Sequence, residues 1–255
     1  MNERTTPGMA GLTPLLLLLI LASNVWIGVT VQQGLGGGSS APSAPSAAVT
    51  PAPAAPGAAA PTPDANAQAA NVKKPSKDDY VKGNAKAEVS IIQYSDFQCP
   101  FCIRAVPTVQ QLLNDYKGKV NWIHREYPLQ FHENARPAAI AALCVGKLGG
   151  SEAFYKFADA AYAKGATDPN VIAPANLPAL AKEAGVNEAK WKSCFDAKET
   201  DARVTSDMAE GTAAGVNGTP GFILINNKTG KVESIAGAQP IASFEAALGR
   251  LGVTK

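Results

Sequence analysis

The sequence has little charge for its length, and no block of like charge occurs among its 255 residues. Its 23 lysines and arginines nearly balance its 21 aspartates and glutamates, so the formal net charge is only +2. A protein that binds nucleic acid normally presents a basic face. The balance and even spread of charge therefore argue against a nucleic-acid partner.

Histidine is almost absent, and there are only four cysteines. The two histidines, His124 and His132, have no cysteine close to them in the sequence. A structural zinc site needs four nitrogen or sulfur ligands, commonly in two closely spaced pairs. We therefore expect no metal and no cofactor, and we expect both histidines at the surface or the rim of the domain.

One long apolar stretch, residues 11–31, follows a short head at residues 1–10 that carries Glu3 and Arg4. A helix of this length spans roughly 30 Å, the thickness of a hydrocarbon core. A cleaved signal peptide is the alternative, but neither an A-x-A-like cleavage site nor a cysteine for lipidation follows the stretch. We favour an uncleaved transmembrane anchor. No basic residue occurs between Arg4 and Lys73, so the head is expected in the cytoplasm and the rest outside it.

Residues 32–75 consist almost entirely of alanine, proline, glycine and serine and show no apolar period. Such a segment cannot bury enough surface to offset the entropy that it would lose on ordering. We therefore expect a disordered linker between the membrane anchor and a folded domain at residues 76–255.

The folded domain alternates strand and helix patterns. A strand leads into a helix, a half-buried alternating strand follows, and then come a long helical block, a hairpin and an amphipathic helix. These elements are predicted, in order, at residues 88–97, 100–116, 120–127, about 134–215, 221–236 and 241–251. The order predicts an α/β fold with a helical insertion.

Cys99 and Cys102 lie three residues apart where the first strand meets the first helix. Two cysteines with this spacing on a first helical turn come close enough to form a disulfide. The free N–H groups and the dipole at a helix N-terminus favour an anion, so Cys99 is predicted to be an exposed nucleophile with a lowered pKa. Cys102 falls on the apolar stripe of the helix and is predicted to be the buried resolving thiol. Pro100 suits the first helical position because its missing N–H would have no helical partner.

Two other interpretations of this cysteine pair are open. It could be half of a zinc site, or it could form a purely structural disulfide. A zinc site lacks its second half, and a structural disulfide would not need a position between strand and helix. Placement and export therefore favour redox chemistry.

The motif SDFQCPFC at residues 95–102, followed far downstream by Gly218-Thr219-Pro220, resembles the DsbA-like branch of the thioredoxin superfamily. The likeness runs from about Gly83 to the end of the chain. It implies a thioredoxin-like core interrupted by a helical domain. It also implies thiol–disulfide exchange through a Cys99–Cys102 disulfide and a mixed disulfide with the substrate.

The same resemblance implies substrate contacts. Pro220 would be a cis-proline that faces the cysteine pair, with Thr219 before it, and the backbone there would pair with an extended substrate. Pro100 and Phe101 would complete the substrate-binding surface. Strongly oxidising relatives carry histidine at the position of Phe101, so a less extreme oxidant is expected here.

Gln93 is a second departure from the family pattern. Thioredoxin-like proteins often place a buried carboxylate six residues before the first cysteine, where it relays protons, but Gln93 cannot ionise. Glu126, on the neighbouring predicted strand, is the candidate relay. The alternative, which we slightly favour, is that Glu126 is a solvated strand residue or is paired with a charge near Arg125.

Cys144 and Cys194 lie on apolar faces of two helices in the inserted block. They could meet as a disulfide or remain two separate buried thiols. Unpaired cysteines are a liability in an exported protein, so we favour the disulfide.

Together these features predict a membrane-anchored oxidase that introduces disulfides into exported proteins. We expect it in the bacterial inner membrane as a single-pass protein, with its catalytic domain periplasmic or otherwise extracytoplasmic. Its partners would be exported cysteine-containing proteins and a membrane redox partner. A disulfide reductase or isomerase, and a tethered substrate-binding or chaperone module, are the alternatives.

Overall fold

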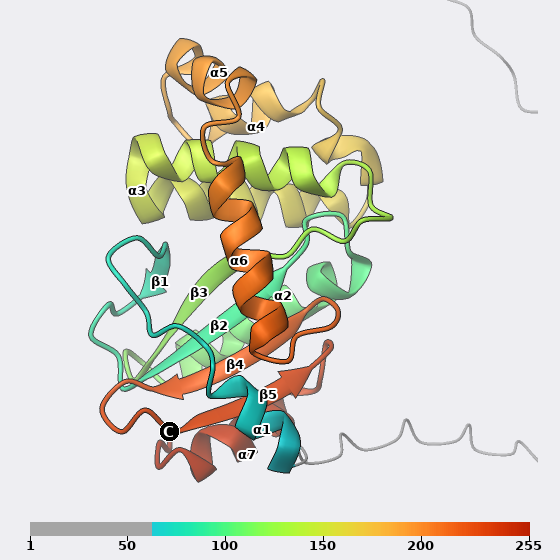
Figure 1. Cartoon of the computed structure of the whole chain (residues 1–255). Helices are drawn as coiled ribbons and strands as arrows, with labels where there is room; N and C mark the ends of the chain where they lie inside the picture. Colours follow the sequence, from blue (N-terminus) through green and yellow to red (C-terminus); the bar gives the residue numbers. More distant parts are fainter. Residues whose placement is uncertain (1–62) are drawn as a thin grey trace, which may run out of the picture. The chain divides into compact units, whose positions relative to one another are not determined.

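The computed structural model describes residues 63–255. The predicted head, the predicted anchor and most of the predicted linker lie outside these residues. Between residues 63 and 255 no helix is both long enough and apolar enough to cross a membrane. The elements are α1 Pro63–Ala69, β1 Val81–Gly83, β2 Val89–Ser95, α2 Pro100–Asp115, β3 Val120–Glu126, α3 Ala135–Gly165, the 3-10 helix η1 Pro169–Ile172, α4 Leu177–Glu183, α5 Glu188–Asp196, α6 Asp201–Ala213, β4 Gly221–Asn226, β5 Val232–Ala236 and α7 Ile241–Arg250 (Figure 1).

The strands form one mixed sheet in the order β1-β3-β2-β4-β5. β2 and β3 are parallel and are joined by α2, and the other neighbours are antiparallel. In the parallel pair Gln93 lies opposite His124, and Ser95 lies opposite Glu126. The predicted order of β-α-β, a helical block and β-β-α is confirmed, with the short strand β1 added at one edge.

Both faces of the sheet are covered, as Figure 1 shows, with α1 and α6 in front of the sheet in that view and α2 behind it. Side chains alternate along a strand, so each face receives every second residue. Val89 and Ile91 of β2 pack into the cluster that includes α2, α3 and α7, whereas Ile92 and Tyr94 pack into the cluster that includes Ala69 and residues around α6. The strand predicted at 120–127 is present as β3, but its predicted half-burial is wrong, because all seven residues of β3 are buried.

The predicted linker ends earlier than expected, because residues 63–75 contribute to the domain. Ala69 and Val72 are buried against the sheet. The Asn66 side chain accepts a hydrogen bond of 2.9 Å from the backbone N–H of Ser234 on the edge strand β5. Two apolar side chains are too few to show a period in sequence, but a sheet face that already exists gives them a place to pack.

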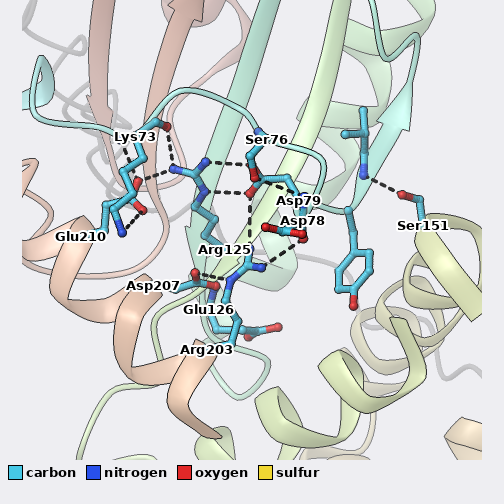
Figure 2. Close-up of polar contacts among 12 residues, drawn as sticks. Lys73, Ser76, Asp78, Asp79, Arg125, Glu126, Ser151, Arg203, Asp207 and Glu210 are labelled. Carbon is cyan, nitrogen blue, oxygen red and sulfur yellow. Dashed lines mark hydrogen bonds and ion pairs between the residues drawn. The ribbon is translucent and has the colours of Figure 1, made fainter. Parts of the chain in front are cut away.

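A buried ion network fastens the next segment to the fold (Figure 2). The Arg125 guanidinium, on β3, donates two hydrogen bonds of 3.0 Å to the carboxylate of Asp79. It also donates to the backbone carbonyl of Lys73 and to the carboxylate of Glu210 on α6. Arg203 of α6 pairs with Asp79 as well. Arg125 thus links the segment after α1 to the sheet and to α6.

The helical block is broken at Gly150, at residues 166–168 and at Gly185. Gly150 has a φ of 69° and separates two halves of α3. Cys144 of α3 and Cys194 of α5 form a disulfide, the alternative that the sequence analysis favoured.

Removing this disulfide is expected to lower the free energy of unfolding by about 4 kcal/mol, since the chain-entropy model assigns that value to a loop of the 50-residue separation found here. The variant is Cys144→Ala/Cys194→Ala, measured by urea unfolding. The matched control is Cys99→Ala/Cys102→Ala, compared with wild type in which only the Cys99–Cys102 pair is reduced. This control also removes two sulfur atoms, but it removes no crosslink. A loss below about 1 kcal/mol would contradict the estimate.

Candidate functional site

The cysteine pair lies at the start of α2, directly after β2. Cys99 is the N-cap residue with an extended backbone (φ −74°, ψ 119°), and Pro100 occupies the first helical position. The Cys99 carbonyl accepts the first backbone hydrogen bonds of the helix, from the N–H groups of Cys102 and Ile103. The Cys99 sulfur thus lies at the N-terminal end of the helix, where N–H groups and the helix dipole favour an anion.

The two thiols have opposite electrostatic environments. Hydrogen bonds lower the pKa of Cys99 from 9.0 to about 5, with the Cys102 side chain as the largest cause and the backbone N–H groups of Cys102 and Phe101 adding to it. Burial raises the pKa of Cys102 well above 9.0, and the adjacent Cys99 raises it further. At neutral pH the charge of the pair therefore rests on Cys99.

Cys99 is less accessible than expected, since its exposed fraction is 3%. The prediction of an exposed nucleophile is wrong in this respect, because the loop before β4 covers the sulfur. The Cys99 sulfur lies 3.3 Å from the backbone carbonyl oxygen of Thr219, to which the protonated thiol donates a hydrogen bond. Phe101, by contrast, is 51% exposed and projects beside the pair.

The Thr219–Pro220 peptide bond is cis. With the Thr219 carbonyl bonded to Cys99, this loop lies beside the pair although 120 residues separate the two in sequence. Cys99 and Cys102 are both free thiols, so the structure gives the reduced form of the pair. The Cys99–Cys102 disulfide of an oxidised form stays a prediction.

A shallow hollow of about 390 Å³ lies next to the exposed side of α2. Its lining comes from the first turns of α2 and from the end of α3, and consists of Pro100, Phe101, Ile103, Arg104, Gly165 and Ala166. The Arg104 guanidinium lies 4.4 Å from the centre of the Phe101 ring. The surface beside Cys99 is therefore mainly apolar, with one cation at its edge.

Gln93 is fully buried beneath the pair, on the face of β2 that points toward α2. Its side-chain nitrogen donates a 3.0 Å hydrogen bond to the Ser95 hydroxyl, which in turn lies 2.7 Å from the Tyr162 hydroxyl. Ser95 partly opposes the burial-driven rise in the pKa of Cys102. Sequence reasoning missed Ser95 and Tyr162. The two-residue spacing of Gln93 and Ser95 on one strand face could have indicated Ser95, but no local signal indicates Tyr162.

Glu126 is also buried, and the basic side chain nearest to it is His124, not Arg125. Its carboxylate lies 3.3 Å from the Nε2 atom of His124, and both side chains are at most 1% exposed. Burial raises the pKa of Glu126, and His124 partly opposes this rise. The favoured interpretation of Glu126 is wrong for the solvated alternative, because the side chain is buried, whereas an ion-pair partner is present in His124. Arg125 points to the opposite face of the sheet.

The histidines lie in different places. His124 is 2% exposed, so its predicted surface or rim position is wrong, and the reason is that helices cover both faces of β3. His132 is half-buried at the rim, with its Nδ1 atom 2.8 Å from the carboxylate of Asp96. In the described part of the chain no group of three or more histidines, cysteines and acidic residues could hold a metal ion.

The lowered pKa of Cys99 leads to a direct prediction. The ultraviolet absorbance of the thiolate should titrate with a midpoint at about pH 5 in the reduced protein. Cys102→Ala should move the midpoint upward by about one pH unit or more, because it removes the largest stabilising hydrogen bond. Cys102→Ser keeps a donor and is the matched control. A wild-type midpoint above pH 8 would contradict this electrostatic account.

Comparisons with known proteins agree with this geometry. A family model described as Thioredoxin matches residues 75–247. Pseudomonas aeruginosa DsbA2 is similar at 26% identity with a TM-score of 0.58, over 70% of this chain and 96% of that chain. Oxidised BdbD from Bacillus subtilis is similar at 22% identity with a TM-score of 0.59, over 71% of this chain and 96% of that chain.

Curated relatives give a narrower match. The Na(+)/H(+) antiporters NhaA 3 of Salinispora tropica and NhaA 1 of Salinispora arenicola are 30% and 29% identical to this chain over 147 residues. The match covers 57% of this chain and 21% of each antiporter, so the chain spans about a fifth of the length of these relatives. Because the match covers so small a part of each antiporter, we infer nothing from it about ion transport by this chain.

Proposed function

We propose an oxidase function for the chain, which belongs to the thioredoxin family and is a DsbA-like protein disulfide oxidoreductase. In this proposal an oxidised Cys99–Cys102 pair accepts electrons from cysteine pairs of exported proteins. The observation that carries the proposal is the stabilised thiolate of Cys99, with a pKa of about 5. A couple whose reduced form is stabilised is a stronger oxidant.

The reaction runs through a mixed disulfide. A substrate thiolate attacks the Cys99 sulfur, a new disulfide forms between substrate and Cys99, and Cys102 leaves as a thiolate. A second substrate thiolate then attacks the substrate sulfur of the mixed disulfide. The substrate gains a disulfide, and Cys99 leaves as the stabilised thiolate, so two electrons have moved to the enzyme.

The substrate would bind across the two segments that meet at Cys99. Thr219 and Pro220 offer backbone for pairing with an extended chain. Pro100 and Phe101, with the apolar hollow beside them, offer surface for substrate side chains. This arrangement suits an unfolded polypeptide, which presents extended backbone and apolar side chains together.

We place the oxidase domain outside the cytoplasm. The main support comes from the sequence, namely the apolar stretch 11–31 and the absence of basic residues between Arg4 and Lys73. The Cys144–Cys194 disulfide is consistent with an oxidising compartment. A single-pass anchor would keep the domain near a membrane redox partner that reoxidises Cys99–Cys102.

The test is the oxidation of a reduced, unfolded protein by the purified, oxidised full chain. One equivalent should form about one substrate disulfide, and the enzyme should end in the reduced form. The control is Cys144→Ala/Cys194→Ala, which should behave like the wild type. The oxidase proposal fails if the chain leaves reduced substrate unchanged but, once reduced, readily cleaves substrate disulfides, since that result would identify a reductase.

A further inference from the structure

Arg104 lies on the exposed side of α2, five residues after Cys99. Of the five arginines between residues 63 and 255, it is the one that makes no ion pair. The others, each paired with at least one carboxylate, are Arg125, Arg136, Arg203 and Arg250. The donors of the Arg104 guanidinium are therefore available to a group from outside the chain.

The Arg104 guanidinium is oriented by a neighbouring ring. It lies 4.4 Å from the centre of the Phe101 ring, which makes a cation–π contact. Stacking on the face of a ring leaves the edge of the planar guanidinium free, and that edge matches the two oxygens of a carboxylate. Because Phe101 and Arg104 both line the hollow of about 390 Å³, the cation stands at the edge of the surface beside the cysteine pair.

The surface around Arg104 is mainly apolar and carries no acidic side chain. A second hollow, of about 270 Å³, shares Pro100, Ile103 and Gly165 with the first and extends to His132. Within residues 63–255 no aspartate or glutamate lines either hollow. His132 is the other basic residue of the lining, and its Nδ1 atom already lies 2.8 Å from the carboxylate of Asp96. The surface therefore offers one unpaired positive charge on an apolar background.

Helix geometry sets the distance between this charge and the reacting sulfur. The five residues from Cys99 to Arg104 correspond to about 7.5 Å along the helix axis, at a rise of about 1.5 Å per residue. An extended chain covers the same distance in about two to three residues, at about 3.3 Å each. A substrate cysteine joined to Cys99 would thus bring a side chain two or three positions away to Arg104.

We propose that Arg104 is a specificity-determining residue that binds a carboxylate two or three residues from the reacting cysteine of the substrate. This inference rests on the proposed oxidase function and names its substrate class, extended polypeptides with an aspartate or glutamate near a cysteine and apolar residues around it. The apolar surface alone would accept any hydrophobic segment. The charge of Arg104 favours acidic segments among these and disfavours basic ones.

The test is the oxidation of reduced two-cysteine peptides by the oxidised full chain. Two peptides are identical except that the residues two positions before and after each cysteine are all Glu or all Lys. The neighbouring charge also changes the pKa of the peptide thiols, so the measured quantity is the change in the Glu-to-Lys ratio of kcat/KM between wild type and variant. Arg104→Gln removes both an attraction and a repulsion, each worth up to about fivefold between exposed charges, and should lower this ratio by about three- to tenfold. Arg104→Glu should lower it further.

Lys190→Gln is the matched control, because Lys190 is exposed on α5, which contributes no residue to either hollow. Its ratio should stay close to that of the wild type. Arg104→Lys keeps the charge and should keep most of the ratio, and added salt should bring the wild type toward Arg104→Gln.

An unchanged ratio in Arg104→Gln, or an equal fall in Lys190→Gln, would overturn the role of Arg104 while leaving the oxidase proposal intact. A wild-type chain that oxidises neither peptide would overturn both.

Discussion

Replacing Cys99 with serine is expected to abolish thiol–disulfide exchange, with a loss of at least about 10³-fold. The reason is that a serine hydroxyl stays protonated at neutral pH and cannot form a disulfide. The Cys99 thiol, with a pKa of about 5, is almost fully ionised there. The measurement is the rate of substrate oxidation by the full chain.

Cys102→Ser is the matched comparison, because it leaves the nucleophile in place. Given a substrate that already carries a disulfide, the Cys99 thiolate of this variant should attack that disulfide and release one substrate thiolate. The mixed disulfide should accumulate because no Cys102 thiol resolves it, and a non-reducing gel should show it as a band that a reductant removes. Cys144→Ala/Cys194→Ala should oxidise substrate at the wild-type rate. Full activity in Cys99→Ser would contradict the enzyme assignment for this cysteine pair.

Arg125→Ala is expected to lower the free energy of unfolding by about 3–5 kcal/mol, the usual cost of removing one partner from a buried ion pair. The arginine side chain is 3% exposed, and its removal leaves the carboxylates of Asp79 and Glu210 buried without it. Urea unfolding at neutral pH measures the loss. Arg136→Ala is the matched control, because the pair of Arg136 with Asp201 lies at the surface and should contribute no more than about 1 kcal/mol.

Arg125→Ala should also reverse the contribution of Asp79 to the pH dependence of the free energy of unfolding. Burial raises the pKa of Asp79, but the hydrogen bond and charge of Arg125 outweigh it, so the pKa lies below its ordinary value of 3.8. A lowered pKa gives stability that is present above 3.8 and is lost as the pH falls through the folded-state value. Without Arg125, burial dominates, so protonation of Asp79 should stabilise the variant as the pH falls toward about 4.

Asp207 and Glu126 act in the opposite sense in both proteins. Burial raises the pKa of each carboxyl, so both favour the folded state more as the pH falls. The difference between wild type and Arg125→Ala therefore isolates the network around Arg125. Equal pH profiles for the two proteins would contradict the role given to Asp79.

The cysteine site could be predicted from sequence because its signals are local. A strand, a helix start and a proline at the first helical position stand within a few residues of Cys99 and Cys102. The cis Thr219–Pro220 bond was accessible only through the resemblance to a family, since by itself Pro220 is an ordinary loop proline. The Cys144–Cys194 pairing remained one of two alternatives until the packing of α3 against α5 was known.

What could not be predicted depends on elements that are distant in the chain. The alternation of β3 is typical of a strand with one solvent-exposed face. In the structure α6, which lies about 80 residues further along the chain, covers that face and buries Arg125 and its partners. His124 and Glu126 lie on the other face of the sheet, where His124 packs against Phe154 and Tyr162 of α3, an element that is also distant in the chain. Tyr162 reaches Ser95 from a helix 67 residues away. Residues 63–75 pack onto the domain because the folded sheet offers them an apolar surface. Their own composition does not predict this packing.

The reduction potential of the Cys99–Cys102 pair tests the central claim most directly. It should be measured on the full chain against glutathione buffers, with Cys144→Ala/Cys194→Ala as the control for the second pair. The stabilised Cys99 thiolate predicts a potential well above the value of thioredoxin, between about −180 and −120 mV, with Phe101 keeping it from the oxidising extreme. A value near −270 mV, or a pair that does not titrate, would contradict the oxidase account.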